Sequence, residues 1–184
     1  MFSSNGNYQV LAVTNNGEKI YIKTTHGFLG SAVKDPYTQE VPGGLFEVDA
    51  LTNETKRIDV DSSGNTFTYQ GWQVDEDDFD ISSDGTKAVF VLRDTENSVS
   101  YSGTRDGIWL KDLVTGEIER VDYQPDFNKL GGSSSPRINN NGSRIFFISD
   151  ISPTGERSNP GNKIYIYLWE KEEGIKLINK DNDG

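Results

Sequence analysis

Cysteine is absent from the chain of 184 residues, which excludes disulfides, thiol catalysis and zinc sites built from thiolates. Histidine occurs once, as His26, so a Ser-His-Asp triad would depend on this residue and a histidine-based zinc site would lack nitrogen ligands. The sequence has no Gly-x-Ser-x-Gly elbow to present a nucleophile and no glycine pattern of a phosphate-binding loop. We therefore predict that the chain is not an enzyme.

Basic residues and long apolar runs are both scarce. Lys and Arg number 18 against 29 Asp and Glu, and the net charge is −11. Binding to nucleic acid or anionic lipid needs basic residues, so neither is expected as a partner. No apolar run approaches the ~20 residues of a membrane helix, which argues against membrane insertion. No N-terminal stretch combines the basic start and apolar core of a signal peptide.

What the chain does contain is an internal repeat. An apolar residue, a polar stretch, an Asn-Gly or Asp-Gly pair and an alternating apolar run occur together three times, with the turns at Asn16-Gly17, Asp84-Gly85 and Asn141-Gly142. Because these residue types tolerate positive φ, the turns are predicted to close two-residue hairpins. The runs that follow are rich in β-branched and aromatic residues, which suit a pleated strand.

A second element follows each turn. Gly44–Ile58 aligns with Gly107–Val121 without a gap, and Lys163–Ile178 aligns with both if one extra residue is placed in its turn. Each copy is typical of two further strands joined by a tight turn. Every repeat therefore predicts four short antiparallel strands, which make up one blade of a propeller.

The expected fold class is all-β: a β-propeller of four-stranded antiparallel blades, with three blades at about residues 1–60, 61–122 and 123–184. A β-sandwich also has short strands, but it has no reason to repeat its turns in register. Three blades would leave open edge strands, whereas closed propellers have about 4–8 blades. We therefore expect either further blades in a larger propeller or self-association to a dimer that completes six.

The middle repeat resembles the TolB-type, WD-like propeller repeats of bacterial proteins. It carries Ser83-Asp84-Gly85, then Ala88-Val89-Phe90, then the stretch from Asp106 to Gly116 that ends in Thr-Gly, and finally Arg120-Val121. The first and third repeats have Asn16 and Asn141 in place of the turn aspartate, and the third lacks the Thr-Gly turn. The resemblance implies a propeller fold and a periplasmic, cell-surface or secreted location.

A propeller without a catalytic motif is expected to be a binding or scaffolding module for a protein or another ligand. A carbohydrate-binding lectin, or an accessory domain of a larger hydrolase or lyase, is the alternative. In an up-and-down blade the short turns share one face and the long connections share the other, and long loops are where function tends to lie. Aromatic residues and arginine are common at binding hot spots. The predicted binding residues on the long-connection face are Tyr69, Trp72, Tyr101 and Arg105.

The densest acidic cluster lies between Asp75 and Asp80. Calcium prefers oxygen ligands, so Asp75, Asp77 and Asp78 are candidate ligands for this ion. A solvated acidic loop or a pair of glycosidase carboxylates would give the same pattern. Calcium is the one cofactor that the sequence leaves open.

Overall fold

The computed structural model describes residues 8–26, 42–60, 62–64, 78–92, 107–122, 133–149 and 164–179. These residues form three antiparallel sheets, each of four strands that neighbour one another in chain order. Blade 1 contains β1 (Tyr8–Val13), β2 (Lys19–His26), β3 (Pro42–Asp49) and β4 (Thr55–Arg57). Blade 2 contains β5 (Phe79–Ile81), β6 (Lys87–Leu92), β7 (Gly107–Asp112) and β8 (Ile118–Arg120). Blade 3 contains β9 (Ser133–Ile138), β10 (Arg144–Ser149), β11 (Tyr165–Glu170) and β12 (Gly174–Leu177).

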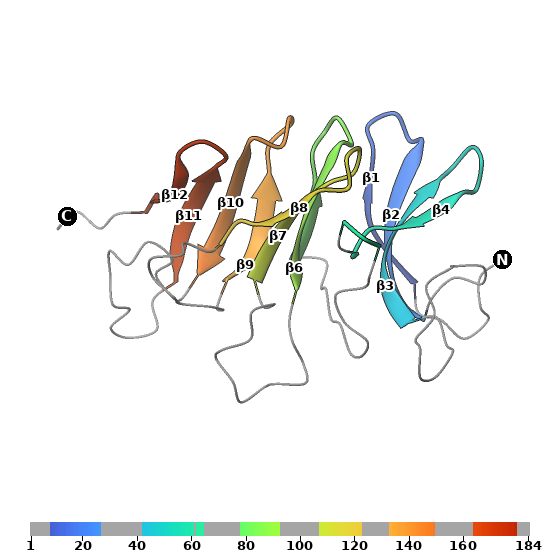
Figure 1. Cartoon of the computed structure of the whole chain (residues 1–184), viewed down its shortest axis with the longest axis horizontal. Helices are drawn as coiled ribbons and strands as arrows, with labels where there is room; N and C mark the ends of the chain where they lie inside the picture. Colours follow the sequence, from blue (N-terminus) through green and yellow to red (C-terminus); the bar gives the residue numbers. More distant parts are fainter. Residues whose placement is uncertain are drawn as a thin grey trace.

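The predicted all-β class and the three predicted four-stranded antiparallel sheets are confirmed. Figure 1 shows the blades side by side in chain order, with the turns that join the first to the second strand and the third to the fourth strand along one edge. We call this edge the tight-turn rim. The second strand of each blade leads to the third at the opposite edge, the long-connection rim. Among the described residues, no helix is long and apolar enough to cross a membrane.

The hairpins on the tight-turn rim are longer than predicted. In the three hairpins that join the first strand of a blade to the second, only the glycines take positive φ, at 73° for Gly17, 69° for Gly85 and 71° for Gly142. In blade 1 the loop is closed by the N–H of Thr14, which donates to the Lys19 carbonyl at 3.0 Å. A two-residue turn would need positive φ at Asn16 as well; instead its side-chain oxygen accepts the N–H of Glu18 at 3.1 Å.

Strand register corrects the alignment of the third repeat. Phe46 pairs with Arg57 in blade 1, Trp109 with Arg120 in blade 2, and Tyr167 with Leu177 in blade 3. Tyr165 therefore occupies the position of Gly44 and Gly107, two residues later than predicted. The turn between β11 and β12 is one residue shorter than its counterparts, not one residue longer.

The core lies between the blades, because each sheet packs one face on the next sheet. Tyr21, Leu45 and Ile58 of blade 1 pack with Phe90 and Leu92 of blade 2. The intervening residues of blade 2 point the other way, toward blade 3, as the two-residue period of a strand requires. Blade 2 is thus covered on both sides, and every residue from Ala88 to Leu92 is at most 2% exposed.

Polar side chains also join neighbouring blades. The buried Lys111 of blade 2 donates to the Val60 carbonyl at 2.5 Å, and Lys56 of blade 1 donates to the Leu113 carbonyl at 3.0 Å. Between blades 2 and 3, a carboxylate oxygen of Asp80 accepts the Ile138 N–H at 2.9 Å. Burying a polar group is costly unless it is hydrogen-bonded, so these contacts help to fix how adjacent blades are placed.

A buried Arg–Asp pair recurs at the outer strands of blades 1 and 2. Arg57 donates to both carboxylate oxygens of Asp59, from Nε at 2.8 Å and from Nη2 at 2.9 Å. Arg120 and Asp122 form the equivalent pair, with Nε to Oδ1 at 2.7 Å. The space for each guanidinium is provided by a glycine on the adjacent strand. A Cβ atom added at Gly107 would lie 2.3 Å from Nη2 of Arg120.

Candidate functional site

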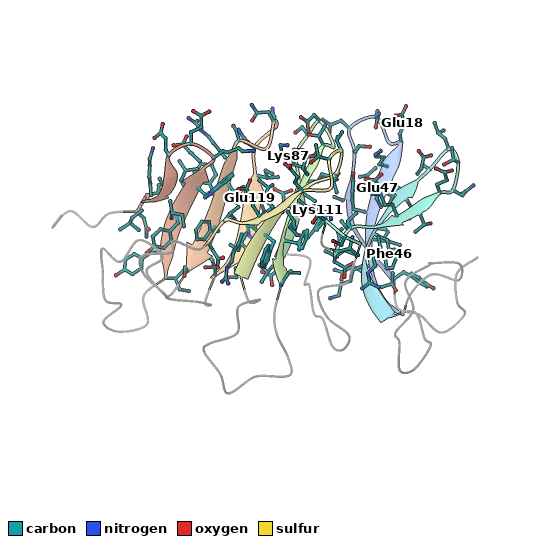
Figure 2. The ribbon with its side chains drawn as sticks, viewed as in Figure 1. Glu18, Phe46, Glu47, Lys87, Lys111 and Glu119 are labelled. Carbon is teal, nitrogen blue, oxygen red and sulfur yellow. The ribbon has the colours of Figure 1, made fainter. Side chains whose placement is uncertain are left out.

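A groove of about 390 Å³ lies on the outer side of the junction between blades 2 and 3. Its apolar lining comes from Leu110 and Ile118. Its charged lining comes from both blades, namely Lys87, Asp112, Glu117 and Glu119 of blade 2 and Lys171 of blade 3. Lys87 lies nearer the tight-turn rim than Glu119 (Figure 2). The groove therefore combines an apolar surface with charges of both signs.

An ion pair holds two of the lining side chains in place. Lys87 and Asp112 are register partners on β6 and β7, and Nζ lies 2.7 Å from Oδ2. The other oxygen of Asp112 accepts the N–H groups of Val114 and Thr115 at 2.9 and 2.8 Å. The hydrogen bond from Lys87, followed by that from Thr115, lowers the pKa of Asp112 to about 2. Asp112 is therefore ionised at neutral pH.

The remaining charges of the groove are open to solvent. Glu117, Glu119 and Lys171 are exposed. Glu119 on β8 is the register partner of the buried Leu110 on β7, so Glu119 lies directly beside a residue of the apolar lining. Exposed carboxylates beside an apolar surface can accept a cationic side chain from a partner.

We expect Asp112→Asn to lower the free energy of unfolding at pH 7 by about 1–2 kcal/mol, with the two N–H contacts retained by the amide oxygen. The folded-state pKa lies below the ordinary value of 3.8, so this contribution is present above about pH 4 and is lost as the pH falls toward 2. Urea denaturation at pH 7 and pH 2.5 measures it. A wild-type advantage of equal size at both pH values would contradict the assignment.

Of the predicted calcium ligands, only Asp78 lies within the described residues. It is 4% exposed, and its Oδ1 accepts the N–H of Ser135 in blade 3 at 3.1 Å. Asp78 thus joins two blades, a role that the sequence analysis missed because its partner is a backbone group far away in the chain. Asp75 and Asp77 lie outside the described residues. Among the residues that the structure does describe, no three His, Asp or Glu side chains gather as metal ligands would.

The predicted binding residues Tyr69, Trp72, Tyr101 and Arg105 also lie outside the described residues. The strand ends that flank Tyr101 and Arg105 are described: Leu92 pairs with Gly107 at the long-connection rim. The groove lies nearer the other rim, so the sequence analysis did not anticipate it. Its lining is brought together by the packing of two blades, and no local motif marks it.

The sequence matches no family model and no curated protein. Among solved structures, the chain is similar to one assigned as TolB from Agrobacterium tumefaciens, with a TM-score of 0.51. The fold is that of a TolB-like propeller. The match covers 95% of this chain at 14% sequence identity. At that identity the likeness concerns the fold alone, and the chain spans 50% of the TolB structure.

Proposed function

We propose that this TolB-like chain is a non-catalytic propeller module that binds a protein partner through the groove between blades 2 and 3. The observation that carries the proposal is the combination of apolar and charged lining in that groove. Binding sites generally join an apolar surface to a few placed polar groups that fix the orientation of the ligand. The resemblance to TolB-type repeats favours a location in the bacterial envelope or outside the cell.

The charges indicate what kind of segment would fit. Lys87 already pairs with Asp112, and among the remaining charged side chains of the groove the two exposed carboxylates of Glu117 and Glu119 outnumber the one exposed amine of Lys171. The chain as a whole carries a net charge of −11, which attracts cationic partners over longer distances. The proposed ligand is therefore an extended protein segment with lysine or arginine next to an apolar residue.

The long-connection rim is a second candidate for binding. Loops on a rigid scaffold often carry binding residues, and Tyr69, Trp72, Tyr101 and Arg105 belong to connections that join this rim. A calcium ion held by Asp75 and Asp77 would belong to the same rim. A partner that uses these residues would leave the groove free, so variants on the two rims separate the two sites.

Replacing Glu117 by lysine is expected to weaken binding of a Lys- and Arg-containing peptide at least about 10-fold, because it reverses a charge of the groove. Fluorescence anisotropy with a library of labelled basic decapeptides, and with acidic peptides of the same length, gives the measurement. Glu54→Lys is the matched control. Glu54 is exposed and holds the equivalent position after the turn of blade 1, where its carbonyl accepts the Asp49 N–H as that of Glu117 accepts the Asp112 N–H.

Equal weakening by both variants would show only a general effect of charge and would refute the groove as the site. If Tyr101→Ala abolished peptide binding while Glu117→Lys had no effect on it, the binding site would be on the long-connection rim and not in the groove. Binding on a glycan array without binding to any peptide would favour the lectin alternative.

A further inference from the structure

The outer strand of blade 2, β8, borders the groove and lies at the edge of its sheet. It ends the strand order β5-β6-β7-β8, so no strand pairs with its other side in the part of the chain that the structure describes. The Asp112 N–H donates to the Glu117 carbonyl. Because hydrogen bonding alternates along an antiparallel pair, Glu117 and Glu119 direct their backbone groups toward β7, and Ile118 between them directs its N–H and C=O outward.

The side chains along this edge alternate between the two faces of blade 2. Glu119 is opposite Leu110, which packs in the core between blades 2 and 3, and Glu117 lies two residues earlier on the same face. Ile118 is opposite Lys111 and packs against the core between blades 1 and 2. The edge therefore presents carboxylates on the side of blade 3 and an apolar side chain on the side of blade 1.

The charge in the middle of β8 is opposite to that of the other two outer strands. Lys56 of β4 and Lys176 of β12 hold the register position of Glu119. Both lysines are already bonded within the chain, Lys56 to a carbonyl of blade 2 and Lys176 to two carboxylates of its own blade. Within the described ranges, the carboxylates of Glu117 and Glu119 have no hydrogen-bonded or ion-paired partner. Blade 2 thus has the outer edge that suits a basic segment.

We propose that the partner segment binds as an added strand on the outer edge of β8, with basic and apolar residues in alternation. This inference rests on the proposed function and specifies how the segment is held. Directly opposed side chains of neighbouring strands share a face, so lysines or arginines lie opposite Glu117 and Glu119 and an apolar residue lies opposite Ile118. In such strand addition, backbone hydrogen bonds supply affinity and the alternating side chains supply specificity.

Fluorescence anisotropy with a labelled decapeptide of alternating lysine and valine tests the alternation. We expect it to bind at least about 10-fold more tightly than a decapeptide of the same composition with the lysines and valines in two blocks. Glu119→Lys is expected to weaken binding of the alternating peptide at least about 10-fold, because it reverses a charge opposite the peptide lysines. The variant should fold, since lysine holds this position in both other blades. Glu54→Lys is again the control.

Methylation of the peptide nitrogens separates strand addition from binding by side chains alone. In an added strand, every second residue directs its backbone groups at β8 and the others direct theirs away. Methylating all valine nitrogens or all lysine nitrogens should therefore abolish binding in one case and change it less than about 3-fold in the other. Loss with methylated valines indicates an antiparallel strand, because Ile118 then bonds to the valine opposite. Loss with methylated lysines indicates a parallel strand.

Equal losses with the two methylated peptides would overturn the added strand, and so would equal affinity for the alternating and block peptides or no effect of Glu119→Lys. If Glu117→Lys still weakened peptide binding in any of these cases, the groove would remain the binding site and only the added strand would be refuted. Absence of binding by every basic peptide would instead refute the proposed function, and the added strand with it.

Discussion

Replacing Arg57 by leucine is expected to lower the free energy of unfolding by about 3–5 kcal/mol, because Asp59 would be left buried without its partner. The two side chains are 5% and 2% exposed, so solvent cannot replace the lost hydrogen bonds. Arg57 also donates to the Gly43 carbonyl at 2.7 Å and lies 5.4 Å from the ring centroid of Phe46. Urea denaturation followed by circular dichroism gives the value.

Blade 3 provides the matched control for this experiment. There Leu177 holds the position of Arg57, and Asn179 that of Asp59, with its oxygen accepting the Ile166 N–H at 2.6 Å. The double variant Arg57→Leu with Asp59→Asn removes both charges together and should recover most of the lost stability. A double variant no more stable than Arg57→Leu would contradict the explanation.

The single variant should also respond to pH in a defined direction. Burial raises the pKa of Asp59, while the attraction of Arg57 opposes this. Without the guanidinium, protonation of Asp59 removes the unpaired charge, so the cost of Arg57→Leu should shrink as the solution becomes more acidic.

Phe147→Ala is expected to cost about 3–5 kcal/mol of unfolding free energy, because it leaves a cavity at the junction of blades 2 and 3. Phe147 is 1% exposed, and its ring stacks on that of Tyr167 with the centroids 5.6 Å apart. Urea denaturation is again the measurement. The loss should appear at every protein concentration, since the contact lies within one chain.

The adjacent residue gives the control. Phe146→Ala removes the same atoms from the open face of blade 3, where the side chain is 41% exposed, and should cost less than about 1 kcal/mol in dilute solution. Equal losses of unfolding free energy for Phe147→Ala and Phe146→Ala in dilute solution would contradict the assignment of one face of blade 3 as buried and the other as open to solvent.

The repeat made the sheets predictable from the sequence. Turn residues at fixed offsets and alternating runs locate most of the strands, since both signals depend on local backbone preferences. The exact hairpin length was not predictable, because Asn16 tolerates positive φ without requiring it. The register of the third repeat was missed because Tyr165 and Leu177 replace the glycine and arginine that mark the other two.

The polar contacts were harder to predict than the sheets. Arg57, Asp59 and Lys111 are residue types that usually lie on surfaces, and nothing local shows that these are buried. The groove depends on how blade 3 sits against blade 2, since Lys87 and Lys171 come from different blades. Such features follow from the packing of sheets, which a repeat pattern predicts only in outline.

The glycine beside each Arg–Asp pair has a consequence for how such blades can diverge. A side chain at Gly44 would displace the guanidinium of Arg57, so neither position can change alone without a penalty. Blade 3 carries the other workable set, with tyrosine, leucine and asparagine at the three positions. In repeats that descend from one ancestor, these three residues would therefore have to be replaced together. A repeat in which only one or two of them had been replaced would be less stable than a repeat with either complete set.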